Sequence, residues 1–339
     1  MFQRPRTRGW HAAAWAAGLV LLALFALASI AIGSRAVHIG ETWRALTDFD
    51  PGRDVDLIIW ELRMPRTLLA MGVGASLGLA GALMQALTRN PLAEPGILGI
   101  NSGASVAVAF GIVYLHLDSA GAYVGLGFLG AAAASIVVYL LGRAHDAGTN
   151  PVRLVLAGAG LSVMLGASAA IIVLSGGETL VQDYHNWASG SLQGRGYDLL
   201  PWVLGTMLLA VLTVMPLGRS LDAMSMGADL GRSLGVRMRA TWVAGGLGVL
   251  LLAGAATAAA GPLAFVGLAA PHVSRLTVGP VHRRLLPFAM LLGALLLLAA
   301  DIAGRVVAMP REIGAGVMAA LVGAPFFIAL ARRRRLAVL

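Results

Sequence analysis

The sequence predicts an all-α, polytopic membrane protein with about ten transmembrane helices and both termini in the cytoplasm. Of its 339 residues, 58% are hydrophobic and only 12% are charged, whereas a soluble protein carries about 25% charged residues. The mean hydropathy is +0.81, and the apolar residues form stretches long enough to cross about 30 Å of hydrocarbon as helices. Arginines flank both ends of the chain. This composition excludes a disordered chain, a coiled coil and a water-soluble enzyme.

Eight apolar stretches each predict one transmembrane helix. A further stretch, 240–278, is too long for one helix and contains Gly261-Pro262 and Pro271, which break helices. It is either one span followed by a surface segment or two spans around a turn at Gly261. The eight clear spans lie at residues 12–32, 67–87, 97–115, 121–142, 152–175, 199–217, 285–304 and 312–331.

The distribution of arginine decides between these alternatives. Three arginines precede the first span, and Arg332–Arg335 follow the last one. Because positively charged segments stay in the cytoplasm, both termini are predicted inside and the number of spans is even. Two spans in 240–278 give ten, and most arginines then lie on the inner side. We expect the first span to be an uncleaved helix, because its apolar run of about 20 residues exceeds the 7–15 typical of a signal peptide.

The second span carries glycines at helical spacing. Gly72, Gly74, Gly78 and Gly81 are separated by two, four and three positions. Small residues let helix backbones approach closely inside a membrane, where no hydrophobic force drives helix association. The pattern therefore predicts close packing of this helix against its neighbours.

Two similar loops suggest an inverted repeat. Asn90-Pro91-Leu92-Ala93 and Gly261-Pro262-Leu263-Ala264 each follow a span rich in Gly and Ala. Ten spans place the two loops at opposite faces of the membrane, as an inverted repeat does in many transporters. Pro, Leu and Ala are common residues, so a match by chance is the alternative explanation.

We expect one transmembrane domain over residues 1–339, with three polar segments between spans. Residues 33–62 and 176–198 are predicted outside the cell and 218–239 in the cytoplasm. In 218–239, Leu221, Met224 and Ala228 recur at helical spacing, which predicts two short surface helices separated at Gly227. These helices either rest on lipid headgroups or dock a soluble partner.

Motifs for chemistry are absent from the sequence. It has no cysteine, hence no disulfide or thiolate metal site within the chain, and no phosphate-binding loop, HExxH or GxSxG motif. The net charge of +9 would suggest nucleic acid for a soluble protein, but we expect no nucleic-acid partner here. The sequence therefore favours a transport pathway without catalysis.

The predicted spans offer few groups that could couple transport to an ion gradient. Few ionisable residues lie within the predicted spans, although such residues mark proton and ion relays. Asp301 and Arg305 are four positions apart and are expected to pair along one helix face. We therefore expect energy from another subunit, with an ion-gradient-driven secondary transporter and an intramembrane enzyme as the alternative classes.

An ordered set of short motifs carries a resemblance to a known family over about 60–335. The motifs are Leu62-Arg63-Met64-Pro65-Arg66, Met84-Gln85-Ala86, Asn90-Pro91-Leu92-Ala93-Glu94-Pro95-Gly96-Ile97-Leu98-Gly99, Gly261-Pro262-Leu263-Ala264-Phe265-Val266-Gly267-Leu268, Pro271-His272, Arg275, Ala300-Asp301, Glu312-Ile313-Gly314 and Gly323-Ala324-Pro325-Phe326-Phe327. In this order they resemble the permease subunits of bacterial ABC importers for iron-siderophores, haem and vitamin B12.

The resemblance implies an assembly in the bacterial plasma (inner) membrane. It implies a permease dimer of two identical or paralogous chains, two ABC ATPase subunits that use ATP and Mg, and an extracytoplasmic substrate-binding protein. The permease itself is expected to bind no cofactor or resident metal and to be no enzyme. Its cargo is expected to be a metal chelate.

The resemblance also implies roles for three arginines. Arg63, Arg66 and Arg305 match positions that meet glutamates of the binding protein. The chemistry is reasonable, because guanidinium groups bind carboxylates in a bidentate manner and charges at a rim steer docking. The alternative is that Arg63 pairs with Glu61 or nearby acids and Arg305 with Asp301.

Two further sites follow from the resemblance. The segment 226–235 matches the coupling helices that enter a cleft of the ATPase, although Ala228 and Gly231 depart from the family pattern. The cytoplasmic gate corresponds to Asn90, Leu92, Thr149 and Asn150; helix capping is the alternative for the last two. The expected ATPase-coupling residues are Leu221, Met224, Gly227, Asp229, Leu234 and Gly235.

The outer segment indicates the cargo. It contains Trp187-Ala188-Ser189-Gly190-Ser191-Leu192, which resembles the siderophore permeases more than those for vitamin B12. We therefore expect a ferric siderophore, with haem second and cobalamin third.

Overall fold

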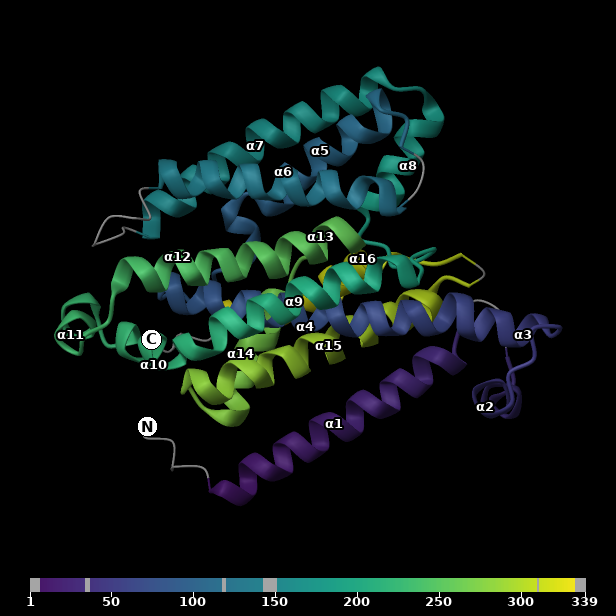
Figure 1. Cartoon of the computed structure of the whole chain (residues 1–339), viewed down its shortest axis with the longest axis horizontal. Coiled ribbons are helices and arrows are strands. Elements are labelled where there is room, and N and C mark those ends of the chain that lie inside the picture. Colours follow the sequence, from purple (N-terminus) through teal and green to yellow (C-terminus); the bar gives the residue numbers. More distant parts are fainter. Residues whose placement is uncertain (1–6, 34–36, 118–119, 143–150, 310, 333–339) are drawn as a thin grey trace.

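The structure is a bundle of long helices lying side by side (Figure 1). This computed structural model describes residues 7–33, 37–117, 120–142, 151–309 and 311–332, and these residues contain no strand. The elements are α1 (Arg8–Ala31), α2 (Ile39–Thr47), α3 (Asp54–Leu57), η1 (Ile58–Arg63), α4 (Met64–Thr88), η2 (Pro95–Leu98), α5 (Ile100–Tyr114), α6 (Ala120–Leu141), α7 (Pro151–Ser175), α8 (Glu178–Ala188), η3 (Tyr197–Leu199), α9 (Leu200–Val214), η4 (Met215–Leu217), α10 (Gly218–Ser225), α11 (Ala228–Ser233), α12 (Met238–Val249), η5 (Leu250–Gly254), α13 (Ala255–Ala260), α14 (Val266–Val278), α15 (His282–Val307) and α16 (Ala315–Arg332).

Each predicted span corresponds to a helix. Seven helices of the described chain are long and apolar enough to cross a membrane, and Ile100–Tyr114 and Ala315–Pro325 are shorter apolar helices. The chain breaks at Gly261, where φ is +81°, a conformation that favours glycine. The turn expected there is confirmed, and it separates the continuous helix Met238–Ala260 from α14, which has only 13 residues.

One helix begins much earlier than expected. The sequence placed its start at residue 67, but a continuous helix runs from Asp54 to Thr88 through the π-helical segment η1. Hydropathy misses this extension because it contains Glu61, Arg63 and Arg66. Part of the predicted outer segment 33–62 is therefore helix.

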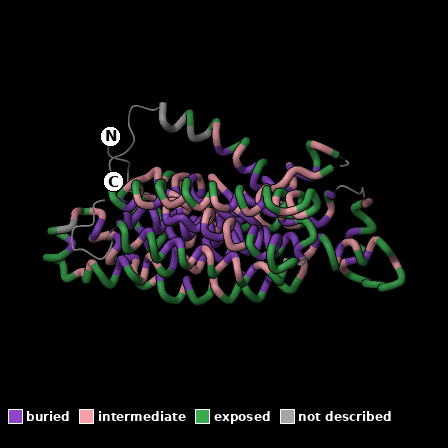
Figure 2. The backbone as a smooth tube through the Cα atoms, turned by 90° about the horizontal axis from the view of Figure 1, so that it is seen from above, coloured by how far each residue is buried: buried purple, intermediate pink, exposed green. Residues whose placement is uncertain are grey.

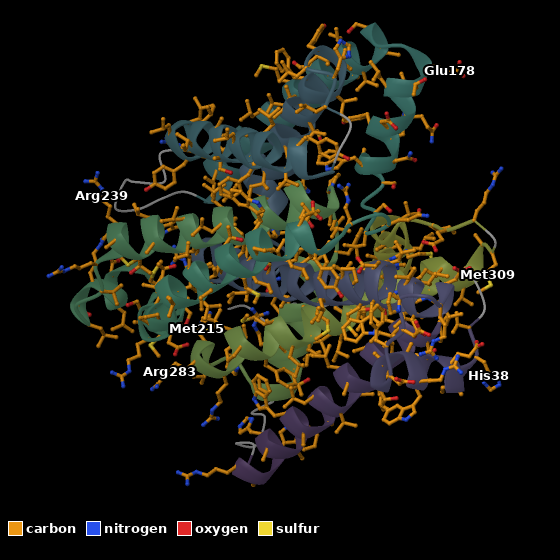
Figure 3. All side chains as sticks on the ribbon, turned by 45° about the vertical axis from the view of Figure 1, so that its right-hand side comes forward. His38, Glu178, Met215, Arg239, Arg283 and Met309 are labelled. Atoms are coloured by element: carbon orange, nitrogen blue, oxygen red, sulfur yellow. The ribbon has the colours of Figure 1, made fainter. Side chains whose placement is uncertain are left out.

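The two ends of the bundle differ in what they carry. Helices α10 and α11 lie at one end, and α2 and α3 lie at the other (Figure 1). Arg239 and Arg283 also lie at the first end, whereas His38 and Met309 lie at the second (Figure 3). We name these the α10 end and the α3 end.

Glycines bring the central helices into close contact, as the sequence predicts. A Cβ atom at Gly78 would overlap the carbonyl oxygen of Ala289 in α15, and one at Gly81 would overlap that of Gly267 in α14. Such contacts let α4 pack backbone to backbone against both helices. Figure 2 shows the buried residues concentrated along the middle of the bundle. The core of the described chain thus forms around α4, α14 and α15.

Candidate functional site

Four charged side chains form a buried network at the α3 end, which we call the arginine network: Arg66, Asp301, Arg305 and Glu312. Arg66 Nη2 donates to Asp301 Oδ1 at 2.8 Å, and Arg66 Nη1 donates to Glu312 Oε2 at 2.6 Å. Arg305 Nη2 donates to the other oxygen of Asp301. The expected pair of Asp301 and Arg305 is confirmed, and the carboxylate of Asp301 also neutralises Arg66.

Arg63 and Arg305 cap the C-terminal end of α1. Arg63 Nη1 donates to the carbonyl oxygens of Ile30 at 2.9 Å and Ala31 at 2.7 Å. Arg305 Nη1 donates to those of Ser29 at 2.7 Å and Ile32 at 3.0 Å. The last carbonyls of a helix have no partner within the helix, and their partial negative charge favours a cation. Two distant arginines therefore complete a helix end that has no basic residue of its own in its last turn.

The predicted docking arginines are thus enclosed in this structure. The exposed fractions of Arg63, Arg66 and Arg305 are 6%, 8% and 1%. All three line a cavity of about 520 Å³ at the α3 end. Contact with a binding protein through these guanidinium groups would require the network to open, and that role stays a prediction.

Two adjoining cavities occupy the α3 end. The first, of about 520 Å³, is also lined by Glu61 and Arg195. The second, of about 400 Å³, is lined mainly by polar residues of α8 and of the loop after it, together with Tyr123 of α6. Arg195 and Glu312 line both cavities. These are the polar recesses of the described chain nearest to the arginine network.

The loop after α8 is held by close backbone contacts. Gly316 N–H donates to the carbonyl oxygen of Gly190 at 2.9 Å. Gly190 has φ of +70°, and a Cβ atom there would lie 2.8 Å from the carbonyl oxygen of Pro262. Only glycine fits this left-handed, crowded position. The part of this loop around Gly190, which precedes Arg195, is therefore held against the start of α16.

At the α10 end, the predicted coupling residues separate into two groups. Leu221 and Met224 are buried in the core, so they hold α10 against the bundle. Asp229 is exposed and pairs with Arg232 at 3.1 Å. Gly227 and Gly235 have φ of +116° and +82° and mark the two ends of α11. The two predicted short helices, separated at Gly227, are confirmed.

An apolar stripe lies open on these surface helices. Met226, Leu230 and Leu234 are all exposed, by 65%, 48% and 60% respectively. Leu230 lies within α11, Leu234 is the C-cap residue of that helix, and Met226 lies just before it, at the end of α10. We call them the α11 stripe. The sequence pattern indicated Leu230 and Leu234 but assigned the buried Leu221 and Met224 to the same surface.

The predicted gate lies partly in the described chain. Asn90 Oδ1 accepts a hydrogen bond from Leu92 N–H at 3.0 Å, an Asx turn that stabilises the loop. Thr149 and Asn150 lie outside the described residues.

The two similar loops meet inside the bundle. The N–H of Phe265 donates to the carboxylate of Glu94, and Phe265 has φ of +68°. Burial raises the pKa of the Glu94 carboxyl, and the Phe265 hydrogen bond opposes that rise. A Cβ atom at Gly267 would lie 3.0 Å from Pro95 Cδ. The loops after α4 and α13 are therefore coupled directly, a contact that sequence spacing did not predict.

Metal ligands are not grouped in the described part of the chain. No set of three or more His, Asp or Glu side chains there is arranged to hold a metal ion.

Comparison with known proteins decides the family. A sequence model of the FecCD transport family matches residues 21–333. The chain belongs to this family. It is 41% identical over 316 residues to the "Probable siderophore transport system permease protein YfiZ" of Bacillus subtilis, covering 93% of this chain and 94% of that protein. It is 40% identical over 319 residues to the ferric enterobactin transport system permease protein FepD of Escherichia coli, covering 94% of each.

A solved structure has the same fold. It is described as a metal-chelate type ABC transporter in an inward-facing conformation, with a TM-score of 0.80 and 28% identity. The match covers 93% of this chain and 97% of that one. The resemblance to iron-chelate permeases is thus confirmed, and this FecCD-family chain is a transport subunit rather than an enzyme.

Proposed function

We propose that this FecCD-family chain is the transmembrane permease of an ABC importer that carries a ferric siderophore into the cytoplasm. The similarity to YfiZ over 93% of the chain carries this proposal. FepD, the permease of a ferric enterobactin system, supports the same cargo class at 40% identity. The family match and the curated relatives do not favour the alternatives that the sequence left open, which are haem, vitamin B12 and an ion-gradient-driven carrier.

The proposed topology has ten spans in the bacterial plasma membrane, with both termini and the α10 end in the cytoplasm. Arg239 and Arg283 at the α10 end support this orientation, since cytoplasmic segments are enriched in Arg. The α3 end would then face outward. Residues 54–88 would form the span that brings Arg66 to the outer face. The similar loops after α4 and α13 support an inverted repeat.

The proposed energy source is a separate ATPase that docks on the α11 stripe and uses ATP and Mg. Three exposed apolar side chains on one short polar segment are typical of a protein interaction site. The permease itself would need no cofactor.

The proposed outer partner is a substrate-binding protein at the α3 end, and the proposed lateral partner is a second permease copy or paralogue. Among the helices long enough to span a membrane, α7 is the least buried. Val163, Ile171 and Leu174 on α7 are strongly exposed. This apolar face supports contact with lipid or with the second permease.

Uptake into proteoliposomes tests the function. The permease, its ATPase and its binding protein are reconstituted. Siderophores and haem labelled with ⁵⁵Fe, and radiolabelled cobalamin, are supplied outside in separate assays. We expect ATP-dependent uptake of a ferric siderophore that persists when an ionophore collapses ion gradients. Uptake by the permease alone, or uptake lost with the ionophore while ATP is present, would support the secondary carrier and contradict the proposal.

A further inference from the structure

Arg195 is a buried cation that has no hydrogen-bond acceptor among the described residues. Its exposed fraction is 7%, and within the described chain Nε and Nη1 are enclosed and make no hydrogen bond. The guanidinium carbon lies 5.7 Å from the centre of the Tyr123 ring, close enough for a cation–π contact. A ring face holds the guanidinium group but accepts no strong hydrogen bond, so the buried N–H groups remain unsatisfied.

Trp187 is a second buried donor in the same place. The Nε1 atom of its indole is enclosed and has no partner in the described chain. Trp187 and Arg195 both line the cavity of about 400 Å³. Asn186, Ser191 and Gln193 line it as well and supply further polar groups. Two orphaned donors on one polar cavity indicate a ligand that brings acceptor oxygens.

The arginine network does not account for Arg195. Arg66 donates to Asp301 and Glu312, and Arg305 donates to Asp301. Glu312 also lines the cavity, but Arg66 already binds its carboxylate at 2.6 Å. Asp183 is the other acid on the lining, and it forms no ion pair with Arg195. The positive charge of Arg195 is therefore available to a ligand.

We propose that Arg195 and Trp187 form a subsite for a negatively charged oxygen group of the transported iron chelate, such as a free carboxylate. This inference rests on the proposed function and deepens it by naming a charge class of substrate. A guanidinium group and an indole N–H together donate several hydrogen bonds to one anionic oxygen group. Neutral chelates lack the group that this subsite binds.

The depth of the subsite favours a small molecule over a partner protein. Pockets of about 300–1,000 Å³ are typical of small-molecule sites, and both adjoining cavities, of about 400 and 520 Å³, lie in that range. A carboxylate on the surface of a binding protein would meet an exposed arginine, whereas Arg195 lies at the wall between two recesses.

Equilibrium binding to the complete transporter in lipid nanodiscs tests the subsite. The probes are ⁵⁵Fe-labelled ferric citrate, which is anionic, and a neutral ferric trihydroxamate. We expect Arg195→Gln to weaken ferric citrate binding by about tenfold or more, as loss of a charged hydrogen bond does, and to leave trihydroxamate binding unchanged. Arg195→Lys should restore part of the loss, and Trp187→Phe should weaken ferric citrate binding less than Arg195→Gln.

Controls separate this inference from folding and from the proposed function. Arg44→Gln removes an exposed arginine of α2 and should bind both probes as the natural chain does. Elution of each variant as an intact transporter checks folding. Equal loss of both probes, unchanged ferric citrate binding by Arg195→Gln, or no ferric citrate binding by the natural chain would overturn the subsite. If the natural transporter still takes up iron chelates with ATP, the proposed function survives that result.

Discussion

Arg66 and Asp301 are 235 positions apart in the chain, and Arg66 Nη2 lies 2.8 Å from Asp301 Oδ1 inside the bundle. Asp301 is fully buried and is shared by Arg66 and Arg305. The sequence did not predict that this acid is buried, and in the structure two guanidinium groups neutralise it. The pair joins α4 to α15 at the α3 end.

Removing Asp301 should destabilise the fold strongly. Asp301→Ala leaves two buried arginines without their shared carboxylate, and breaking a buried ion pair from one side costs about 3–5 kcal/mol. Thermal unfolding of the purified permease measures the loss. Asp48→Ala is the matched control, because its pair with Arg53 at 3.7 Å is largely exposed and is worth about 0–1 kcal/mol. Equal melting temperatures for the two variants would contradict a structural role of the arginine network.

Adding one methyl group between α4 and α15 should loosen the core. The Cβ atom of Gly78→Ala would overlap the carbonyl oxygen of Ala289, and overpacking of this kind costs about 1–3 kcal/mol. Gly205→Ala in α9 is the control, since its Cβ atom would meet no atom within 4 Å. Melting temperatures of both variants check this, and a Gly78→Ala variant as stable as the control would disprove close backbone packing.

A charge on the α11 stripe should weaken ATPase binding. Leu234→Glu places a carboxylate on an exposed apolar side chain, and we expect affinity for the ATPase to fall about tenfold, or about 1.4 kcal/mol. Co-purification and titration of the ATPase measure the change. Met309→Glu changes another exposed apolar residue, at the α3 end, and this variant should bind the ATPase normally. ATPase binding that survives Leu234→Glu unchanged would place the docking surface elsewhere.

The Glu94 carboxyl should make stability depend on pH. Burial raises its pKa in the folded protein above the ordinary value of 4.5, so the folded state favours the protonated form. The stability of the natural chain relative to Glu94→Gln is therefore greatest below pH 4.5 and falls as pH rises through the raised pKa. Melting temperatures of both proteins from acidic to neutral pH check this. A difference in melting temperature between the two proteins that stays constant with pH, or that changes in the opposite direction, would contradict the prediction.

Hydropathy predicted the helices well but not all of their ends. Apolar stretches define spans because a membrane requires them, and the turn at Gly261 follows from a helix-breaking Gly-Pro pair. The predicted start of the helix that begins at Asp54 was too late in the chain. Arg63 and Arg66 are charged and therefore predicted a polar loop, although both are buried. Burial of a charge depends on distant partners that local sequence does not show.

The same limit applies to the candidate sites. Asp301 and Arg305 could be paired from sequence because they are four positions apart on one helix, whereas the contacts of Asp301 with Arg66 and of Glu94 with Phe265 depend on the fold. Periodicity found an apolar pattern in 218–239 but could not tell that Leu221 faces the bundle while Leu234 faces out. One sequence feature pointed to Arg195 as a site residue, namely its position just after the Trp187–Leu192 stretch.

The capping of α1 by Arg63 and Arg305 has a consequence for synthesis. A ribosome delivers α1 to the membrane first, but the Arg305 that binds the carbonyl of Ser29 follows 276 positions later. The carbonyl groups of Ser29 and Ile32 therefore lack their Arg305 partner until nearly the whole polypeptide has been made. A nascent chain that stops before α15 has only Arg63 to bind the end of α1, so an unfinished copy differs from a complete one at its first helix.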